Sequence, residues 1–245
     1  MEKLLYLLWK NETESSRHFN ERLLGPLKGR LRELGAWQLK INVADEAVAP
    51  AAALRQSSMK PVFDAVLSFW VNAAHFRAPF QAAIEAAVAR AAGYLVLDSV
   101  AIPNTAQLAA DGERTPGWAQ IAVLQRPPRL TQEAWLEIWL GSHTGVAIDT
   151  QSTFHYCQNV VVRPLTYGAP PISAVVEESF PAEAMTDSQV FFAAAGDEAR
   201  YQQHLKRMMD SCVRFIDFDK IDVVPTSEYR VGGWADLRHA GEVPR

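Results

Sequence analysis

The chain contains the same succession of elements twice, and this duplication limits its possible folds more than any other feature. Two six-residue segments share the pattern L-G-x-x-x-G, namely Leu24–Gly29 and Leu140–Gly145. Each follows a short apolar run and lies in a stretch of helical character. Each precedes a strand, a second strand, a helix and a last strand, and these last strands end alike, in Val-Ala-Ile-Pro at 100–103 and Asp-Val-Val-Pro at 222–225. The repeat predicts two β-α-β-β-α-β units in tandem.

The boundaries follow from apolar periodicity and from turn signals. In the first half the pattern predicts strands over 3–10, 37–43, 62–71 and 94–102, with helices over 17–34 and 79–92. In the second half it predicts strands over 118–125, 154–162, 172–180 and 215–224, with helices over 131–150 and 197–214. Asp-Gly and Pro-Gly pairs between 104 and 117 separate the halves. We therefore expect unit 1 at 1–108, unit 2 at 109–230 and a tail at 231–245, with the polar stretch from Thr226 onward packing loosely or not at all.

The strands indicate how the two units associate. A β-α-β-β-α-β sheet carries both helices on one face, yet segments such as 62–71 and 160–162 are apolar on both faces. The face without helices must therefore be buried, and the other unit's sheet is the nearest partner. The sequence predicts an α+β fold of two ferredoxin-like units packed sheet to sheet, as a barrel-like sandwich with a cavity between sheets and helices.

Composition excludes several classes of function. The 245 residues carry a net charge of −4, which argues against nucleic acid as a partner, and no apolar stretch is long enough to cross a membrane. The two cysteines have neither metal-ligand spacing nor a disulfide framework, so we expect a cytoplasmic protein without a metal site. No phosphate-binding loop is present, and no nucleotide cofactor or any other cofactor is expected.

The second half resembles the EthD family of the dimeric α/β-barrel superfamily. The resemblance begins in Arg126–Thr131, a turn of sequence R-P-P-R-L-T, and continues through E-A-W-L-E-I-W at 133–139 to His143. The strand F-H-Y-C-Q-N-V-V at 154–161 matches the family's Y-x-Q-N element. These motifs cover roughly 40 residues, about the size of one supersecondary motif. In the first half Leu27 stands where His143 stands in the second, so the chain resembles a fused tandem with at most one family-like site.

The resemblance implies an intrachain dimeric α/β barrel and a cofactor-independent enzyme. Its substrate would be a flat, apolar or aromatic small molecule, and its chemistry that of a dehydratase, cyclase or monooxygenase. Two alternatives stay open. One is a non-catalytic binding or stress-associated protein with the same barrel. The other is a haem protein of the chlorite-dismutase type, in which His143 or His204 would hold the iron. Association into a homodimer is also expected.

His143 is the first candidate for catalysis. Trp135, Trp139 and His143 are spaced four residues apart and share one helix face. A histidine beside an aromatic stripe could act as a general base towards a phenol or ketone, with the tryptophans as apolar walls of the binding site. Equally, the tryptophans could be ordinary core residues and the histidine a half-exposed helix residue.

The following strands supply the second set of candidates. Tyr156 and Gln158 share one face and Asn159 the other, so Tyr156 is a candidate catalytic group, while Gln158 and Asn159 are candidates for binding substrate. His155, opposite Tyr156, is expected to face solvent or the helix layer. Glu177 and the next residue, Glu178, interrupt an apolar strand and must point to opposite faces. A carboxylate in the barrel lumen would have its pKa raised by desolvation and could serve as an acid or base, and Glu177 is the candidate for binding substrate. The alternative is that one glutamate is an exposed edge residue and the other pairs with a lysine or arginine.

Overall fold

The computed structural model describes residues 1–232, and its strands appear in the duplicated order that the sequence predicts. The described residues form eight strands: β1 (Glu2–Trp9), β2 (Trp37–Val43), β3 (Ala65–Val71), β4 (Arg90–Ile102), β5 (Trp118–Leu124), β6 (His155–Pro164), β7 (Ala174–Phe180) and β8 (Asp222–Val231). They close into one barrel in the order β1-β3-β2-β8-β5-β7-β6-β4, and every neighbouring pair is antiparallel.

The two units join along two seams. Strands β2 and β8 pair at one seam, and β4 and β6 pair at the other. Each seam supplies backbone hydrogen bonds to a strand that would otherwise end a sheet, so neither unit leaves an unpaired edge. The expected sheet-to-sheet association is confirmed, and pairing of the edges closes it into a barrel.

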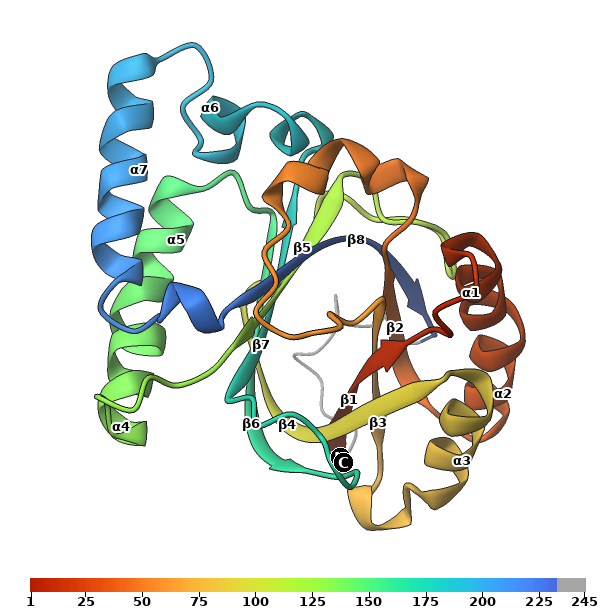
Figure 1. The fold of residues 1–245 in the computed structure, drawn as a ribbon. Coiled ribbons are helices and arrows are strands. Elements are labelled where there is room, and N and C mark those ends of the chain that lie inside the picture. The colour runs from red at the N-terminus through yellow and green to blue at the C-terminus, as the bar shows by residue number, and fades with distance from the viewer. Residues whose placement is uncertain (233–245) are drawn as a thin grey trace, which may run out of the picture.

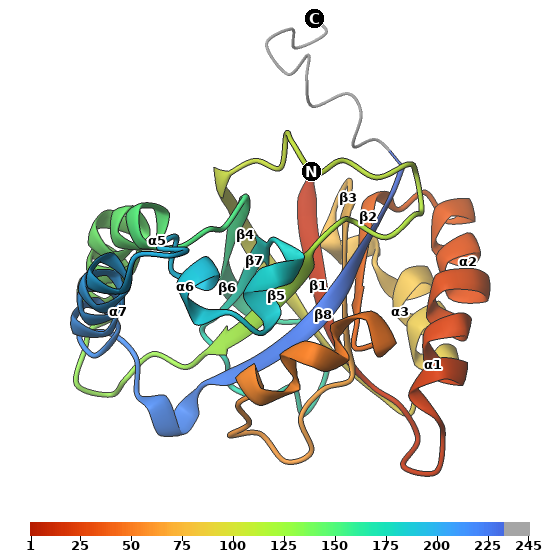
Figure 2. The same ribbon diagram turned by 90° about the horizontal axis from the view of Figure 1, so that it is seen from above.

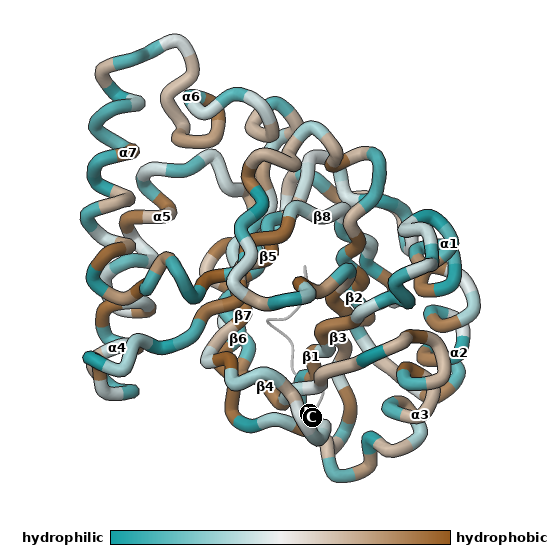
Figure 3. The backbone as a smooth tube through the Cα atoms, in the orientation of Figure 1, coloured by the Kyte–Doolittle hydropathy of each residue, from teal (hydrophilic) through white to brown (hydrophobic). Residues whose placement is uncertain are grey.

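Helices cover the barrel on two opposite sides (Figure 1). The first unit contributes α1 (Ser16–Arg22), α2 (Lys28–Glu33) and α3 (Ala78–Ala87), and the second contributes α4 (Gln132–Leu136), α5 (Thr144–Thr150), α6 (Ser188–Phe191) and α7 (Glu198–Cys212). Seen from above, the two helix layers lie on either side of the strands (Figure 2). Hydrophobic residues are frequent along the strands, whereas hydrophilic and hydrophobic residues alternate along outer helices such as α7 (Figure 3).

The repeated L-G-x-x-x-G segments fall at the same structural irregularity in both units. A π-helical segment, η1 (Leu23–Leu27), joins α1 to α2, and a second, η4 (Glu137–His143), joins α4 to α5. Such wider turns are rare and often lie at functional sites. Neither Gly141 nor Gly145 is needed for close helix packing, because a Cβ built on either would contact nothing within 4 Å.

Two further expectations about the end of the chain are also wrong. The last strand does not run over 215–224 but over 222–231, because residues 218–220 form a 3-10 turn, η6 (Phe218–Lys220). The polar stretch from Thr226 to Glu228 does not pack loosely. It is buried in β8, where Thr226 accepts a hydrogen bond from Asn42 and itself donates one to Ala119. Residues 233–245 of the expected tail lie outside the described residues.

The barrel interior is divided into an apolar and a charged half. Leucines and valines of β1, β5, β7 and β8 fill the apolar half, together with Tyr94 and Phe63. The charged half holds three cations and three carboxylates on inward-facing strand positions, namely Lys3, Lys40, Arg230, Asp98, Glu177 and Glu228. Because the charges balance, each ion has a partner that offsets part of its desolvation. No helix within residues 1–232 is long and apolar enough to cross a membrane.

Candidate functional site

A cavity of about 620 Å³ lies between the helices and the sheet of the second unit. Its floor is the outward face of β5, β6 and β7, and its roof comes from η4, α6, α7 and the segment after α7. The walls are mostly apolar, with Trp139, Phe191, Phe192, Met208 and Phe215 among them. Apolar cavities of this size with a few polar groups are the usual form of small-molecule sites.

A row of three polar side chains crosses the floor of the cavity. Glu178 on β7 lies directly opposite Gln120 on β5 and Tyr156 on β6. The Gln120 amide nitrogen donates to the Glu178 carboxyl at 3.1 Å. Burial raises the pKa of Glu178 to about 7, and the hydrogen bond from Gln120 offsets only part of that effect. At neutral pH this carboxyl group is therefore poised between its protonated and ionised forms.

Tyr156 is held in place by its neighbour on the same strand face. The Gln158 amide nitrogen donates to the Tyr156 hydroxyl at 3.0 Å and to the Thr144 hydroxyl at 2.8 Å. Burial raises the pKa of Tyr156, so the phenol keeps its proton at neutral pH. A hydroxyl that accepts from Gln158 retains its own hydrogen for another acceptor. Gln158 itself does not line the cavity but positions a residue that does.

His143 reaches the cavity from the roof, at the end of the π-helical segment η4. Its ring packs against Phe215, with centroids 4.6 Å apart, and Nδ1 lies 3.0 Å from the Ser211 hydroxyl. Burial, with the nearby Arg214 cation adding to it, lowers the pKa of His143 to about 4. Arg214 also donates to the Ser211 oxygen, which leaves the serine hydrogen for Nδ1. The imidazole is thus neutral at pH 7, and this arrangement favours the tautomer with its hydrogen on Nε2.

The other residues expected at the site lie elsewhere. Trp135 is buried beside Trp139, and its indole nitrogen donates to the Phe215 carbonyl at 3.0 Å, so it supports the wall without lining it. Asn159 and Glu177 point into the barrel, on the far side of the sheet from the cavity. There Asn159 accepts from Lys3 at 2.7 Å and donates to Glu177 at 2.9 Å.

Glu177 therefore lies in the barrel interior and does not face the cavity, and the alternative expectation for it, pairing with a lysine, is confirmed. Glu177 forms ion pairs with both Lys3 and Lys40 inside the barrel. Burial alone would raise its pKa, but the two lysines outweigh burial and hold the pKa well below its usual range. His155 faces the same interior instead of solvent or the helices, with Nδ1 3.0 Å from the Ile102 carbonyl. Strand alternation separates the two glutamates, but it cannot say which of them faces the cavity.

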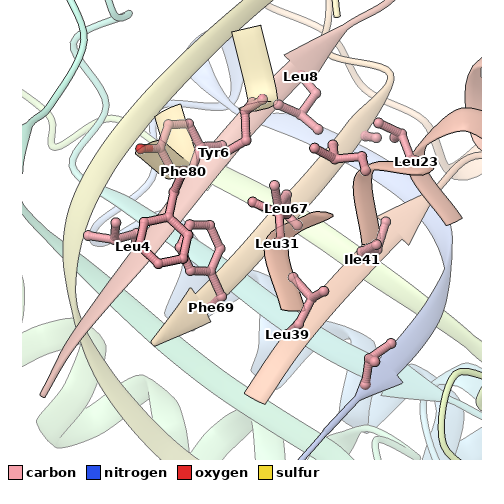
Figure 4. Close-up of a cluster of buried hydrophobic side chains, with 14 of the residues drawn as sticks. Leu4, Tyr6, Leu8, Leu23, Leu31, Leu39, Ile41, Leu67, Phe69 and Phe80 are labelled. Atoms are coloured by element: carbon pink, nitrogen blue, oxygen red, sulfur yellow. The ribbon is translucent and has the colours of Figure 1, made fainter. Parts of the chain in front are cut away.

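The first unit has a filled core where the second has its cavity. Its sheet register places Leu4 opposite Phe69, as Gln120 lies opposite Glu178 in the second unit. Both residues belong to a cluster with Tyr6 and Phe80, whose side chains fill the space between strands and helices (Figure 4). Leu27, the counterpart of His143, is buried in the same cluster. The polar row is thus a property of the second unit alone.

The side chains of residues 1–232 do not fit a metal site, and those lining the cavity do not fit haem. Within residues 1–232 no group of three or more histidine, cysteine, aspartate or glutamate side chains could hold a metal ion. Haem carries two propionates that need cations or other donors, yet the described cavity lining contains no lysine or arginine and includes the buried carboxyl of Glu178. His204, the other candidate for iron, has its Nδ1 2.6 Å from the Phe192 carbonyl and does not line the cavity.

Comparison with known proteins identifies the fold. No protein-family model matches the sequence, and no curated protein is significantly similar to it. Among solved structures, an anthrone oxidase-like protein aligns at 7% identity over 95% of this chain and 94% of its own, with a TM-score of 0.50. A chlorite dismutase from Candidatus Nitrospira defluvii aligns at 8% identity over 93% of this chain and 90% of its own, with a TM-score of 0.47. A dye-decolorizing peroxidase from Bacteroides thetaiotaomicron aligns at 8% identity over 98% of this chain and 96% of its own, with a TM-score of 0.44.

The likeness to the anthrone oxidase-like protein extends over nearly the whole chain and concerns the fold, in which two β-α-β-β-α-β units close into one barrel. At such low sequence identity a structural likeness shows the fold and not the activity, because one fold supports many unrelated activities. The activity depends on the residues that line the cavity of the second unit.

Proposed function

We propose that the second unit is an EthD-like, cofactor-independent enzyme unit that binds an apolar or aromatic small molecule carrying a hydroxyl or carbonyl oxygen. The observation that carries the proposal is the combination of an apolar cavity with three polar groups from opposite walls: Glu178 and Tyr156 on the floor and His143 on the roof. An isolated polar group in such a cavity is costly, and three of them converging on one space is typical of a site that handles protons.

The three groups have complementary protonation states. Glu178, with a pKa of about 7, is the general base, because an effective base titrates near the working pH. Neutral His143 and protonated Tyr156 are hydrogen-bond donors to a substrate oxygen. The Glu178 carboxylate takes a proton from a carbon next to a carbonyl, and the electron pair moves onto the carbonyl oxygen. That oxygen accepts hydrogen bonds from Tyr156 and His143, and return of the proton regenerates the carboxylate.

This assignment changes the part that His143 plays. On sequence grounds the histidine was the natural base, but a pKa of about 4 leaves it a weak one, whereas its Nε2 hydrogen is a good donor. The apolar walls around Trp139 and Phe215 favour a flat ring system and keep water from the reacting atoms.

Proton exchange at a simple ketone tests the proposal without knowledge of the natural substrate. The protein is mixed with 2-tetralone in D2O, and loss of the proton next to the carbonyl is followed by NMR. We expect exchange above the buffer rate, its abolition in Glu178→Gln and a loss of about 10²-fold in His143→Gln. Circular dichroism checks that both variants fold.

A binding measurement separates catalysis from simple binding. Isothermal titration with 2-naphthol reports whether the cavity takes a neutral bicyclic ligand. Absence of both binding and exchange would refute the proposal. Binding without exchange would favour the non-catalytic binding protein, and in that case His143→Gln should leave the protein's ligand affinity unchanged.

A further inference from the structure

Part of the cavity wall in the second unit comes from the first unit. The connection between β2 and β3 contains a 3-10 segment, η2 (Glu46–Leu54), and it leaves its own unit to reach the cavity. Pro50, Ala53, Leu54 and Gln56 all line the cavity. In Figure 1 this connection, in orange, runs across the barrel end towards α6 and β8.

Hydrogen bonds tie this connection to the last strand of the second unit. Gln56 pairs with Val223 through both backbone bonds, at 3.0 and 2.9 Å. The Asp222 carboxylate accepts from the backbone nitrogens of Ser58 at 2.7 Å and Met59 at 2.8 Å. Asp222 is fully buried, so these bonds are shielded from water. The connection is therefore a fixed wall and not a loose loop.

Apolar packing fixes the same connection at its other end. Val48 and Ala51 are buried in a cluster with Trp118, Phe180 and Ala184, all of which belong to the second unit. Leu54 and Met185 pack against this cluster and also line the cavity. The connection from the first unit and the segment before α6 thus share one core next to the cavity.

The corresponding connection of the second unit crosses to the first unit and packs against its core. Between β6 and β7, Leu165 donates its backbone nitrogen to the Gly93 carbonyl at 2.8 Å, and Tyr94 donates its hydroxyl to the Pro170 carbonyl at 2.8 Å. Leu165 then packs into the filled core of the first unit. The exchange of connections is reciprocal: the connection of the first unit lines the cavity of the second, and the connection of the second unit packs into the core of the first.

We propose that residues 50–56 of the first unit are the specificity-determining wall of the cavity, and that they set the largest ligand the second unit admits. This inference rests on the proposed function of the cavity. Among the lining residues, Pro50, Ala53 and Gln56 are exposed, as are Thr186, Ser188 and Phe218 of the second unit. Exposed lining residues mark the mouth of the cavity, so the ligand enters past the first unit. The first unit thereby limits access to the cavity of the second.

A size series of neutral phenols tests this wall. Isothermal titration measures binding of phenol, 2-naphthol and 2-hydroxyanthracene to the full chain and to two variants that narrow the mouth, Ala53→Trp and Gln56→Trp. We expect at least one variant to lose about tenfold or more in affinity for 2-hydroxyanthracene while phenol binds within about twofold of wild type. Ala52→Trp is the matched control, because Ala52 is exposed on the same segment but does not line the cavity.

The outcomes distinguish this inference from the proposed function. If the wild-type chain binds none of the three phenols, the proposed function of the cavity fails and the wall fails with it. If the wild type binds them and both narrowing variants keep the wild-type size profile, the inference about the wall is overturned while the cavity stands. If Ala52→Trp shifts the profile as strongly as the variants at the mouth, the inference is overturned as well.

Discussion

Replacing Glu178 with glutamine should stabilise the protein at pH values above 4.5, the ordinary pKa of a glutamate side chain, and not below. Burial raises the pKa of this carboxyl from 4.5 to about 7. At about 1.36 kcal/mol for each pH unit, the interval between these values corresponds to about 3 kcal/mol of stability. Glutamine has nearly the same shape, cannot ionise and can still accept the hydrogen bond from Gln120.

The sign of the effect follows from proton binding in the two states. Below pH 4.5 the carboxyl is protonated in both the folded and the unfolded chain and costs no stability. Between pH 4.5 and 7 the unfolded chain loses its proton first, so the stability of the wild type falls as the pH rises. Above pH 7 both states are ionised and the full cost is present. The variant should therefore match the wild type near pH 4.5 and exceed it by up to about 3 kcal/mol at pH 8.

Urea unfolding at a series of pH values between 4.5 and 8 measures this difference. Glu183→Gln is the control for the loss of one negative charge, because Glu183 is exposed on the surface of the second unit. A stability difference between Glu178→Gln and wild type that stays constant over this range would refute the reasoning, since the carboxyl would then titrate alike in both states.

Three other substitutions have expected outcomes. Lys40→Met removes one of the two cations that pair with each of the buried carboxylates Glu177 and Glu228 and should cost about 3–5 kcal/mol in urea unfolding at pH 7, so an unchanged midpoint would contradict the ion cluster. Tyr156→Phe should weaken 2-naphthol binding about fivefold with little change in melting temperature. If the variant binds 2-naphthol as tightly as the wild type, the Tyr156 hydroxyl does not contact the ligand. Asp222→Ala should accelerate amide hydrogen exchange at Ser58 and destabilise the fold by about 2 kcal/mol, whereas unaltered exchange would show that the carboxylate does not hold the connection.

The sequence was most informative where one physical rule governs the local structure. Alternation along a strand correctly placed Tyr156 with Gln158 and separated both from Asn159. The duplicated pattern predicted two units, and the apolar character of both strand faces predicted that their sheets would cover each other. These features depend on local periodicity and on burial, which a single sequence displays.

The sequence was least informative where polar residues are buried. Thr226–Glu228 has the composition of an exposed tail, yet these residues belong to β8. Inside the barrel Asn42 donates a hydrogen bond to Thr226 and Arg230 donates one to Glu228. The expectation that His155 faces solvent or the helix layer is wrong for the same reason, since its side chain faces the charged half of the barrel interior. Lysines and carboxylates recurring at inward positions of apolar strands, as at Lys3 and Glu177, were the signal for that interior.

The wall formed by residues 50–56 was beyond the reach of sequence reasoning. The Ala-rich stretch after Val43 has the composition of an ordinary connection, and nothing local in it indicates that it crosses to the other unit. Its position depends on long-range partners such as Val223 and Asp222, which are brought together only by closure of the barrel.

A crystal structure of the protein with 2-naphthol would test the central claim most directly. We expect the ligand between the helices and the sheet of the second unit, with its hydroxyl within hydrogen-bonding distance of Glu178 and its rings against Trp139 and Phe215. We also expect the leucine- and phenylalanine-filled core of the first unit to stay unoccupied. A second-unit cavity that remains empty at saturating ligand, or a ligand bound only elsewhere, would contradict the claim that this cavity is the functional site.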